Sequence, residues 1–265
     1  MISTDEELTS NPEINSHPNS PTTRSSRAHG IIPSMTDATA FNEDRAKGYD
    51  DRALRLIPGY EVLHDLSDLI LSAELPANAS LLVGGAGTGM EIARSGARHP
   101  AWTFLGVDPS EPMVATGRQR IQNAGISERV RWVVGSVEDL PEEETFDAAT
   151  LLLVLHFIPD HGEKEALLSA IADRLKPGAP LLMATMFGEP DSTRYKRLVS
   201  FSKAWAISQG MEADKAAELC NPARTDLHIV SEERVKALLR NGGFIDVQRI
   251  YQALSIGLWL ARTPR

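Results

Sequence analysis

Hydrophobic residues along most of the chain follow two alternating spacings. Residues 60–73 repeat apolar side chains at helical intervals, and strand-like apolar runs begin at residue 80. The strand-like runs cover residues 80–83, 103–107, 130–135, 148–154 and 180–187, and the helical stretches between them cover residues 88–98, 111–123 and 163–175. This alternation predicts βαβ units, and therefore an α/β fold with a parallel sheet covered by helices on both faces.

The pattern changes after residue 187. Residues 188–229 have a helical composition without a strand-like run, which predicts a helical insertion in the domain. Residues 231–241 predict a further helix, which a Gly-Gly pair ends. Two closely spaced apolar runs, at 244–251 and 254–261, predict a terminal hairpin.

The beginning of the chain differs from the rest. Residues 1–38 are rich in Ser, Thr, Asn and Pro and have no hydrophobic periodicity. Such a segment buries too little apolar surface to offset the entropy lost on ordering. We therefore expect a disordered N-terminal tail at residues 1–38 and one folded domain at residues 39–265.

Composition and charge narrow the classes of partner. The chain has 265 residues, 42% of them hydrophobic, and a formal net charge of −9. Nucleic-acid binding usually needs a basic surface, so we expect no nucleic-acid partner. An acidic chain of this length is typical of a soluble enzyme that acts on small molecules.

Cysteine content and apolar run length bear on the compartment. Cys220 is the only cysteine, so no disulfide can form within the chain, which indicates a reducing compartment. The longest apolar stretch, residues 148–159, is shorter than the roughly 20 residues that span a bilayer. No apolar segment follows the first residues, as a secretory signal would require. We expect a cytoplasmic protein without a membrane partner.

A glycine-rich turn follows the first predicted strand, in the sequence LLVGGAGTGMEIA at residues 81–93. The dinucleotide-binding pattern G-x-G-x-x-G fails here, because Met90 stands at its last position. The triphosphate-binding loop fails as well, since it needs a lysine and this segment has none. The remaining pattern, G-x-G-x-G, predicts close approach to a ligand at the carboxyl edge of the sheet.

Two further strand ends lie at the same predicted edge. Asp108 ends the second strand, where a carboxylate can accept hydrogen bonds from both ribose hydroxyls of an adenosine-containing ligand. Alternatively, Asp108 caps the helix that begins near Ser110. The third strand ends in GSVEDLP, at residues 135–141, where adenine would lie in such a fold.

These positions together resemble class I S-adenosylmethionine-dependent methyltransferases. The match covers roughly residues 41–263 and includes G-x-G-x-G, Asp108, GSVEDLP, FDAATLLLVLHFI at 146–158 and LKPG at 175–178. The resemblance implies a Rossmann-like sheet of seven strands with the last strand antiparallel, and S-adenosyl-L-methionine as cofactor.

A closer likeness is to carboxy-S-adenosylmethionine synthases and their methyltransferase-like relatives. It rests on residues 41–60, above all Ile57-Pro58-Gly59-Tyr60, on the segment after the fifth strand, and on VKALLRNGGF at 235–244. The resemblance implies that Tyr60 contacts the amino-acid end of the cofactor, and it suggests a homodimer. The implied cofactor-binding set is Tyr60, Gly85, Ala86, Gly87 and Gly89 with Asp108, Pro109, Met113, Ser136, Val137 and Leu152.

The chain departs from these relatives at several positions. Val83 stands where many family members carry an acid, Ser136 replaces a common Asp, and Leu152 replaces the Asn of the carboxylating branch. The arginine that pairs with the extra carboxylate in that branch aligns with Cys220, and Arg224 is displaced from it. A buried carboxylate without a cationic partner is costly. We therefore favour methyl transfer to a small-molecule acceptor, with a carboxy-S-adenosylmethionine synthase-like enzyme as the alternative. The helical insertion at residues 188–229 is then expected to form a lid over the acceptor site.

The candidate catalytic groups are histidines. His156, after the fourth strand, and His228, at the end of the insertion, could remove a proton from the acceptor, although a structural role is the alternative for each. We expect no metal site, since the histidines and acids lack suitable spacing. Tyr195 and Trp205 could line an aromatic acceptor pocket or pack in the core. A cofactor-binding regulatory or assembly protein without transferase activity is the rival function class.

Overall fold

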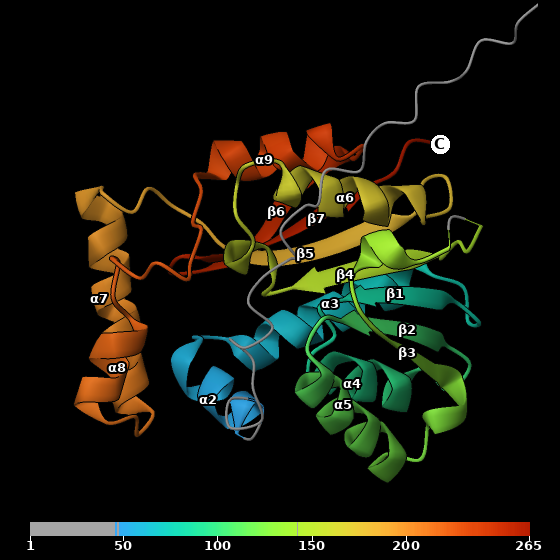
Figure 1. Cartoon of the computed structure of the whole chain (residues 1–265), viewed down its shortest axis with the longest axis horizontal. Coiled ribbons are helices and arrows are strands. Elements are labelled where there is room, and N and C mark those ends of the chain that lie inside the picture. Colours follow the sequence, from blue (N-terminus) through green and yellow to red (C-terminus); the bar gives the residue numbers. More distant parts are fainter. Residues whose placement is uncertain (1–45, 47, 142) are drawn as a thin grey trace, which may run out of the picture. The chain divides into compact units, whose positions relative to one another are not determined.

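The computed structural model describes residues 46, 48–141 and 143–265 (Figure 1). The tail expected at residues 1–38 lies outside the described residues. The helices are α2 (Tyr49–Leu56), α3 (Tyr60–Glu74), α4 (Met90–Arg98), α5 (Glu111–Asn123), α6 (Glu163–Asp173), α7 (Thr193–Ser208), α8 (Ala213–Leu219) and α9 (Glu232–Asn241), with short 3₁₀ helices η2 (Ser127–Arg129), η3 (Val137–Asp139) and η4 (Leu155–Phe157). The strands are β1 (Ser80–Gly84), β2 (Thr103–Asp108), β3 (Val130–Val134), β4 (Ala148–Leu152), β5 (Pro180–Met186), β6 (Ile245–Ala253) and β7 (Ile256–Arg262).

The strands form one seven-stranded sheet in the order β3-β2-β1-β4-β5-β7-β6. Strands β1 to β5 pair in parallel, whereas β7 runs antiparallel to both β5 and β6. The predicted α/β fold, with seven strands and an antiparallel last strand, is therefore confirmed. The terminal hairpin inserts β7 between β5 and β6, so that β6 is the edge strand.

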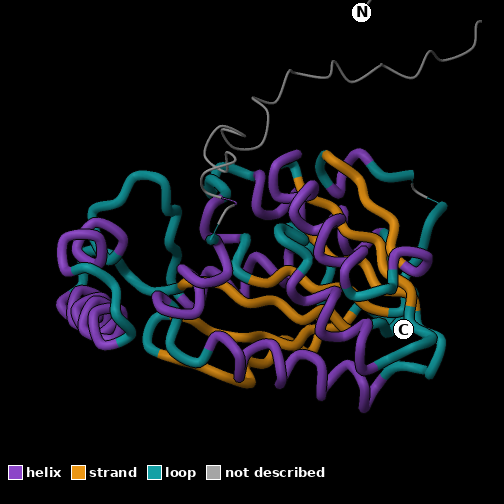
Figure 2. Tube along the Cα trace, turned by 90° about the horizontal axis from the view of Figure 1, so that it is seen from below, coloured by secondary structure: helices purple, strands orange, loops and turns teal. Residues whose placement is uncertain are grey.

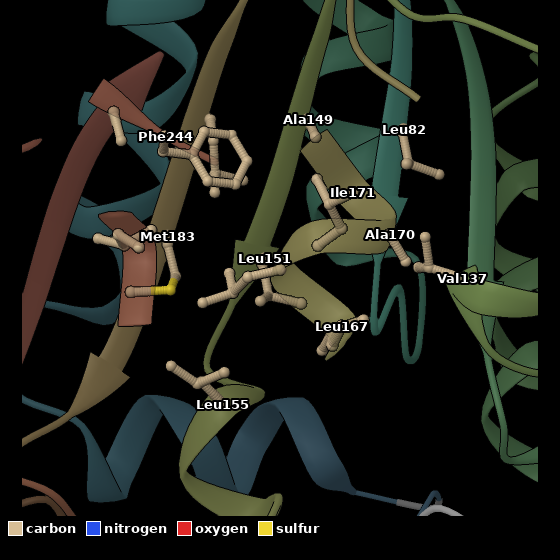
Figure 3. Close-up of a cluster of buried hydrophobic side chains, with 14 of the residues drawn as sticks. Leu82, Val137, Ala149, Leu151, Leu155, Leu167, Ala170, Ile171, Met183 and Phe244 are labelled. Atoms are coloured by element: carbon tan, nitrogen blue, oxygen red, sulfur yellow. The ribbon is translucent and has the colours of Figure 1, made fainter. Parts of the chain in front are cut away.

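Helices cover both faces of the sheet (Figures 1 and 2). One face packs against α6 and α9, where Leu82 and Leu151 meet side chains such as Leu167 of α6 (Figure 3). The other face packs against α3, α4 and α5, where Leu81 lies in one buried cluster with Leu63, Ile92 and Ile121. Neighbouring residues of β1 point to opposite faces of the sheet, and helices cover both faces. The apolar run of β1 is therefore continuous rather than alternating.

Strand and helix bounds differ from the predicted ones at the carboxyl edge of the sheet. The strand predicted at 148–154 ends at Leu152, because Leu153 adopts a left-handed conformation with φ of 64°. The helix predicted at 88–98 begins at Met90, because Gly87 and Gly89 also have positive φ. Backbone strain of this kind in a non-glycine residue is concentrated at functional sites.

The predicted insertion at residues 188–229 contains α7 and α8 and no strand. Both helices lie beyond the end of the sheet, and α7 contacts α2 (Figures 1 and 2). Among the described residues, no helix is both long and apolar enough to cross a lipid bilayer.

Candidate active site

A cleft of about 1100 Å³ opens at the carboxyl ends of β1, β2 and β4. The structure brings together in its wall all of the predicted cofactor-binding residues except Gly89. These are Tyr60, Gly85, Ala86, Gly87, Asp108, Pro109, Met113, Ser136, Val137 and Leu152. We call this space the first cavity.

Gly85 and Gly87 give the first cavity its close backbone wall. Gly85 has φ of 62°, and a Cβ atom built on it would lie 2.2 Å from Val154 Cγ2. Gly87 has φ of 51°, and its N–H donates to Asp108 Oδ2 at 2.8 Å. Gly89 lies outside the lining, at the start of α4, where a Cβ would meet Gly117 Cα of α5 at 3.2 Å. The geometry of Gly89 thus fits close packing of α4 on α5.

Asp108 holds the end of β2 to the glycine turn. Its second oxygen, Oδ1, accepts from Ser110 N–H at 2.9 Å, but the N-cap of α5 is Ser110 rather than Asp108. Burial raises the pKa of Asp108, and the hydrogen bonds from Ser110 and Gly87 partly offset that rise. Each carboxylate oxygen keeps one further lone pair that can accept from a ligand hydroxyl.

Helices α2 and α3 form the opposite wall. Asp50 of α2 accepts from Thr88 Oγ1 at 2.7 Å and pairs with Arg120 of α5, which fastens α2 to the glycine turn. Tyr60, at the start of α3, is buried, and burial raises the pKa of its phenol. Its ring lies edge-on to the ring of His64, with centroids 4.6 Å apart.

Sequence reasoning missed several residues of this wall. Tyr49, His64, Glu91 and Leu153 line the first cavity. Glu91 carried a signal, since it is an acid in the first turn of the helix that follows the glycine turn. Burial raises its pKa to about 7. The other three come close only through tertiary packing.

A second cavity of about 1000 Å³ adjoins the first. The two share Tyr49, Leu153 and Phe157 as lining residues. Most of its lining side chains are apolar, some of them from α2, α7 and the end of α8, and the polar lining residues include Arg52, His156, Tyr195, Asn221 and Arg224. Tyr195 thus lies where the sequence allowed an acceptor pocket, whereas Trp205 is not among the lining residues.

The two candidate histidines lie in different surroundings. His156 is buried in the wall of the second cavity, and Met186 N–H donates to its Nδ1 at 3.3 Å, which assigns the proton of the neutral ring to Nε2. Burial, with the nearby Lys164 charge, lowers the pKa of His156 to about 3. His228 lines neither cavity, and its N–H donates to His156 O at 2.7 Å. Because its pKa is so low, the His156 ring is a weak base at neutral pH.

Arg224 lies in the second wall with its charge already paired. Its Nε donates to Asp226 Oδ1 at 2.8 Å, its Nη2 donates to Asp226 Oδ2, and its Nη1 donates to Leu219 O at 3.1 Å. Cys220 is adjacent in the same wall. Within the described part of the chain, no three His, Cys, Asp or Glu side chains gather in a metal-binding group.

Comparison with known proteins agrees with this geometry. Residues 82–178 match the sequence model of the methyltransferase domain. A carboxy-S-adenosyl-L-methionine synthase from Actinobacillus succinogenes is 27% identical over 87% of this chain and 95% of that protein. The ubiquinone/menaquinone biosynthesis C-methyltransferase UbiE from Geobacter sulfurreducens is 30% identical over 64% of this chain and 66% of that protein.

A solved structure shares the fold. An O-methyltransferase family protein from Burkholderia thailandensis superposes with a TM-score of 0.59 at 18% identity, covering 85% of this chain and 61% of that one. The sheet order, the glycine turn with Asp108, the matching domain and these relatives agree with the resemblance predicted from the sequence. The chain therefore belongs to the class I S-adenosylmethionine-dependent methyltransferases.

Proposed function

We propose that this enzyme transfers the methyl group of S-adenosylmethionine to a small-molecule acceptor bound in the second cavity. The observation that carries the proposal is the junction of the two cavities, which share Tyr49, Leu153 and Phe157. A cofactor in the first cavity and an acceptor in the second would meet at that junction. Alignment of two bound reactants can replace effective molarities of about 10⁵–10⁸ M.

The residues of the first cavity support binding of the adenosine part of the cofactor. Asp108 would accept from the ribose hydroxyls, and Ser136 and Val137 would lie against the adenine. The glycine turn lets the backbone approach the ligand, since any side chain at Gly85 would meet Val154. When bound, the cofactor supplies an electrophilic sulfonium methyl group, so the protein need only bind, orient and exclude water.

The charges of the second cavity support methyl transfer. Arg224, the arginine close to the position used by the carboxylating branch, is engaged by Asp226 through two hydrogen bonds. A carboxylate on the ligand would have to compete with that internal partner. A largely uncharged acceptor, held by apolar walls and a few polar groups, fits the cavity better.

An acceptor whose nucleophilic atom is already neutral needs no general base, so its alignment with the methyl group is sufficient for transfer. Where the acceptor must lose a proton, His156 is the histidine in the cavity wall. Its low pKa favours a role as hydrogen-bond donor through Nε2, which would orient the acceptor. His228 could act only indirectly, through its backbone contact with His156.

The relatives favour a second candidate function. Carboxy-S-adenosyl-L-methionine synthases match this chain over most of their length. Mass spectrometry of ligand that co-purifies with the protein separates the two functions. We expect S-adenosylmethionine or S-adenosylhomocysteine, whereas a cofactor heavier by one carboxyl group would refute methyl transfer.

Cofactor binding is tested by calorimetric titration with S-adenosylhomocysteine. Asp108→Ala removes the proposed ribose acceptor, so we expect affinity to fall at least about 10-fold. Asp147→Ala is the matched control, because Asp147 also accepts from a strand backbone, Ser80 N–H at 2.8 Å, but lies outside both cavities. Equal affinity in the wild type and Asp108→Ala would refute the ribose assignment.

Turnover is tested with methyl-labelled S-adenosylmethionine and a metabolite extract. We expect formation of S-adenosylhomocysteine together with a labelled small molecule. Binding of the cofactor without any labelled product, across extracts from several growth conditions, would instead support the non-catalytic regulatory or assembly role.

A further inference from the structure

Glu91 lines the first cavity with a carboxylate. It lies in the first turn of α4 and interacts with Tyr60 of α3 and Thr150 of β4, while His64 of α3 lines the same cavity. Neither helix propensity nor core packing requires an acid in this half-buried place. Glu91 is therefore a candidate for ligand recognition.

No basic side chain of the described residues forms an ion pair with Glu91. The nearby arginines are engaged elsewhere: Arg94 pairs with Asp65 at 2.7 Å, and Arg120 pairs with Asp50. Burial raises the pKa of Glu91 to about 7, and the Thr150 hydroxyl lowers it only in part. A carboxylate removed from water without a cation is costly, so a cationic ligand group would be bound favourably here.

Two further polar side chains lie nearby: His64 packs against Tyr60, and Thr150 faces Glu91. His64 is buried, and its Nε2 has no hydrogen-bond partner among the described residues. Burial, followed by the Arg94 charge, lowers the pKa of His64 to about 4, so the ring is neutral at pH 7 and Nε2 can accept or donate. Thr150 Oγ1 faces Glu91, but its geometry falls short of a well-formed hydrogen bond within the described structure.

The sheet register explains where this carboxylate comes to lie. Thr150 is the cross-strand partner of Val83, the apolar residue that precedes the glycine turn by one position and is 1% exposed. Paired residues of parallel strands point to the same face of the sheet. A carboxylate beside the Thr150 side chain therefore also lies near the Val83 side chain. Glu91 thus brings a negative charge from α4 to a strand end that has none of its own.

We propose that Glu91 binds the α-ammonium group of S-adenosylmethionine, with His64 Nε2 as a second polar contact at the amino-acid end. The proposal rests on the cofactor site described under Proposed function, and it is independent of the acceptor. In this proposal two acids recognise the same ligand: Asp108 binds the ribose, and Glu91 binds the amino-acid end. Val83 can then be apolar without loss of the charge that the ammonium group requires.

Two ligands distinguish binding at the amino-acid end of the cofactor site from binding at its adenosine end. S-adenosylhomocysteine carries the amino-acid group, whereas 5′-methylthioadenosine has the same adenosine and sulfur but lacks it. Glu91→Gln should weaken binding of S-adenosylhomocysteine about 30-fold or more, since it leaves a desolvated ammonium without its anion. Binding of 5′-methylthioadenosine should stay within about 3-fold of the wild type. Glu111→Gln is the matched control, because Glu111 is the acid in the first turn of α5 and does not line the cavity.

Proton release gives a readout that a structural role would not change. With a pKa of about 7, Glu91 is partly protonated in the free protein at pH 7, and an ammonium partner would remove that proton. Titrations in buffers of different ionisation enthalpy should therefore show proton release for S-adenosylhomocysteine but not for 5′-methylthioadenosine. The other titratable groups that line this cavity are Tyr49, Tyr60, His64 and Asp108, and Asp50 and Arg120 act on Tyr60 beside Glu91. Glu91→Gln should abolish the release.

The outcomes are distinguishable. Wild-type affinity of Glu91→Gln for S-adenosylhomocysteine, or equal losses for both ligands, would overturn the role of Glu91. Thermal unfolding of each variant shows whether a loss reflects the fold. If wild-type protein binds neither ligand at millimolar concentration, the cofactor site itself is refuted, and the role of Glu91 with it. Loss confined to S-adenosylhomocysteine, with proton release abolished, would establish the proposal.

Discussion

Replacing Gly85 by alanine tests whether the glycine turn is shaped by Val154. A Cβ at residue 85 would lie 2.2 Å from Val154 Cγ2, 3.2 Å from its Cγ1 and 3.3 Å from its Cβ. Val154 is stiff, because it branches at Cβ, and it cannot swing its methyl groups away without leaving its rotamer. The added methyl must therefore displace the backbone of the turn or of the segment after β4.

Two separate costs add in this variant. A non-glycine residue at φ of 62° costs about 1–2 kcal/mol, and overpacking costs about 1–3 kcal/mol. Gly85→Ala should thus lower the free energy of unfolding by about 2–5 kcal/mol. Gly87→Ala is the matched control, since its φ is 51° but its nearest neighbour, Met113 Cε, would be 3.6 Å away. The control should lose only about 1–2 kcal/mol.

Equilibrium unfolding in urea measures both variants, and a double-mutant cycle isolates the clash. Val154→Ala removes both of the nearest atoms and costs at most about 1–2 kcal/mol by itself. Combined with Gly85→Ala, it should restore about 1–3 kcal/mol relative to additivity. Equal losses for Gly85→Ala and Gly87→Ala, or strict additivity in the cycle, would refute the steric argument.

Two more predictions concern buried titratable groups. The pKa values of His64 and His156 are lowered to about 4 and 3, whereas unfolded histidine titrates near 6.5, so the unfolded chain binds more protons and stability should fall as the pH drops below 6.5. His156→Gln should remove about 1.4 kcal/mol per pH unit from that dependence between pH 6 and pH 4.5, and an unchanged slope in urea titrations would contradict it. Lys164 is buried and donates to Leu155 O at 2.6 Å and to His228 O at 2.9 Å. Lys164→Met should therefore speed hydrogen exchange of the His228 amide about 10-fold or more, while the exposed Lys176→Met should leave it unchanged.

Much of the fold follows from signals that are local in the sequence. The strand periods, the glycine turn and Asp108 each need only a few adjacent residues to be identified, and parallel strands bring their carboxyl ends to one edge. That is why most of the predicted cofactor-binding residues line one cavity. Gly89 was placed with them because it shares the motif, but its Cβ position faces Trp132 and Gly117. The sequence pattern does not distinguish a glycine that faces a ligand from one that faces a helix.

The residues that could not be predicted meet only through tertiary packing. His64, Glu91 and Thr150 come from α3, α4 and β4, and no spacing rule joins them. The left-handed conformation of Leu153 is likewise invisible in an apolar run that reads as a continuing strand. Leu153 lines both cavities, so this backbone position lies at their junction. Such a position is held by its surroundings, here by the hydrogen bond of Leu153 N–H to Ala184 O at 2.7 Å.

Two of the departures from the related proteins, Val83 and the displaced Arg224, have one electrostatic explanation. At the end of β1, Val83 carries no carboxylate, and Glu91 of the first cavity brings one beside its cross-strand partner Thr150, without an ion pair among the described residues. In the second cavity, which both Arg52 and Arg224 line, Asp226 pairs with Arg224 within the wall. An unpaired anion favours a ligand with an ammonium group, and an arginine that is already paired attracts a ligand carboxylate less. Asp226→Asn should therefore raise the affinity of the second cavity for anionic ligands without changing the affinity of the first cavity for 5′-methylthioadenosine.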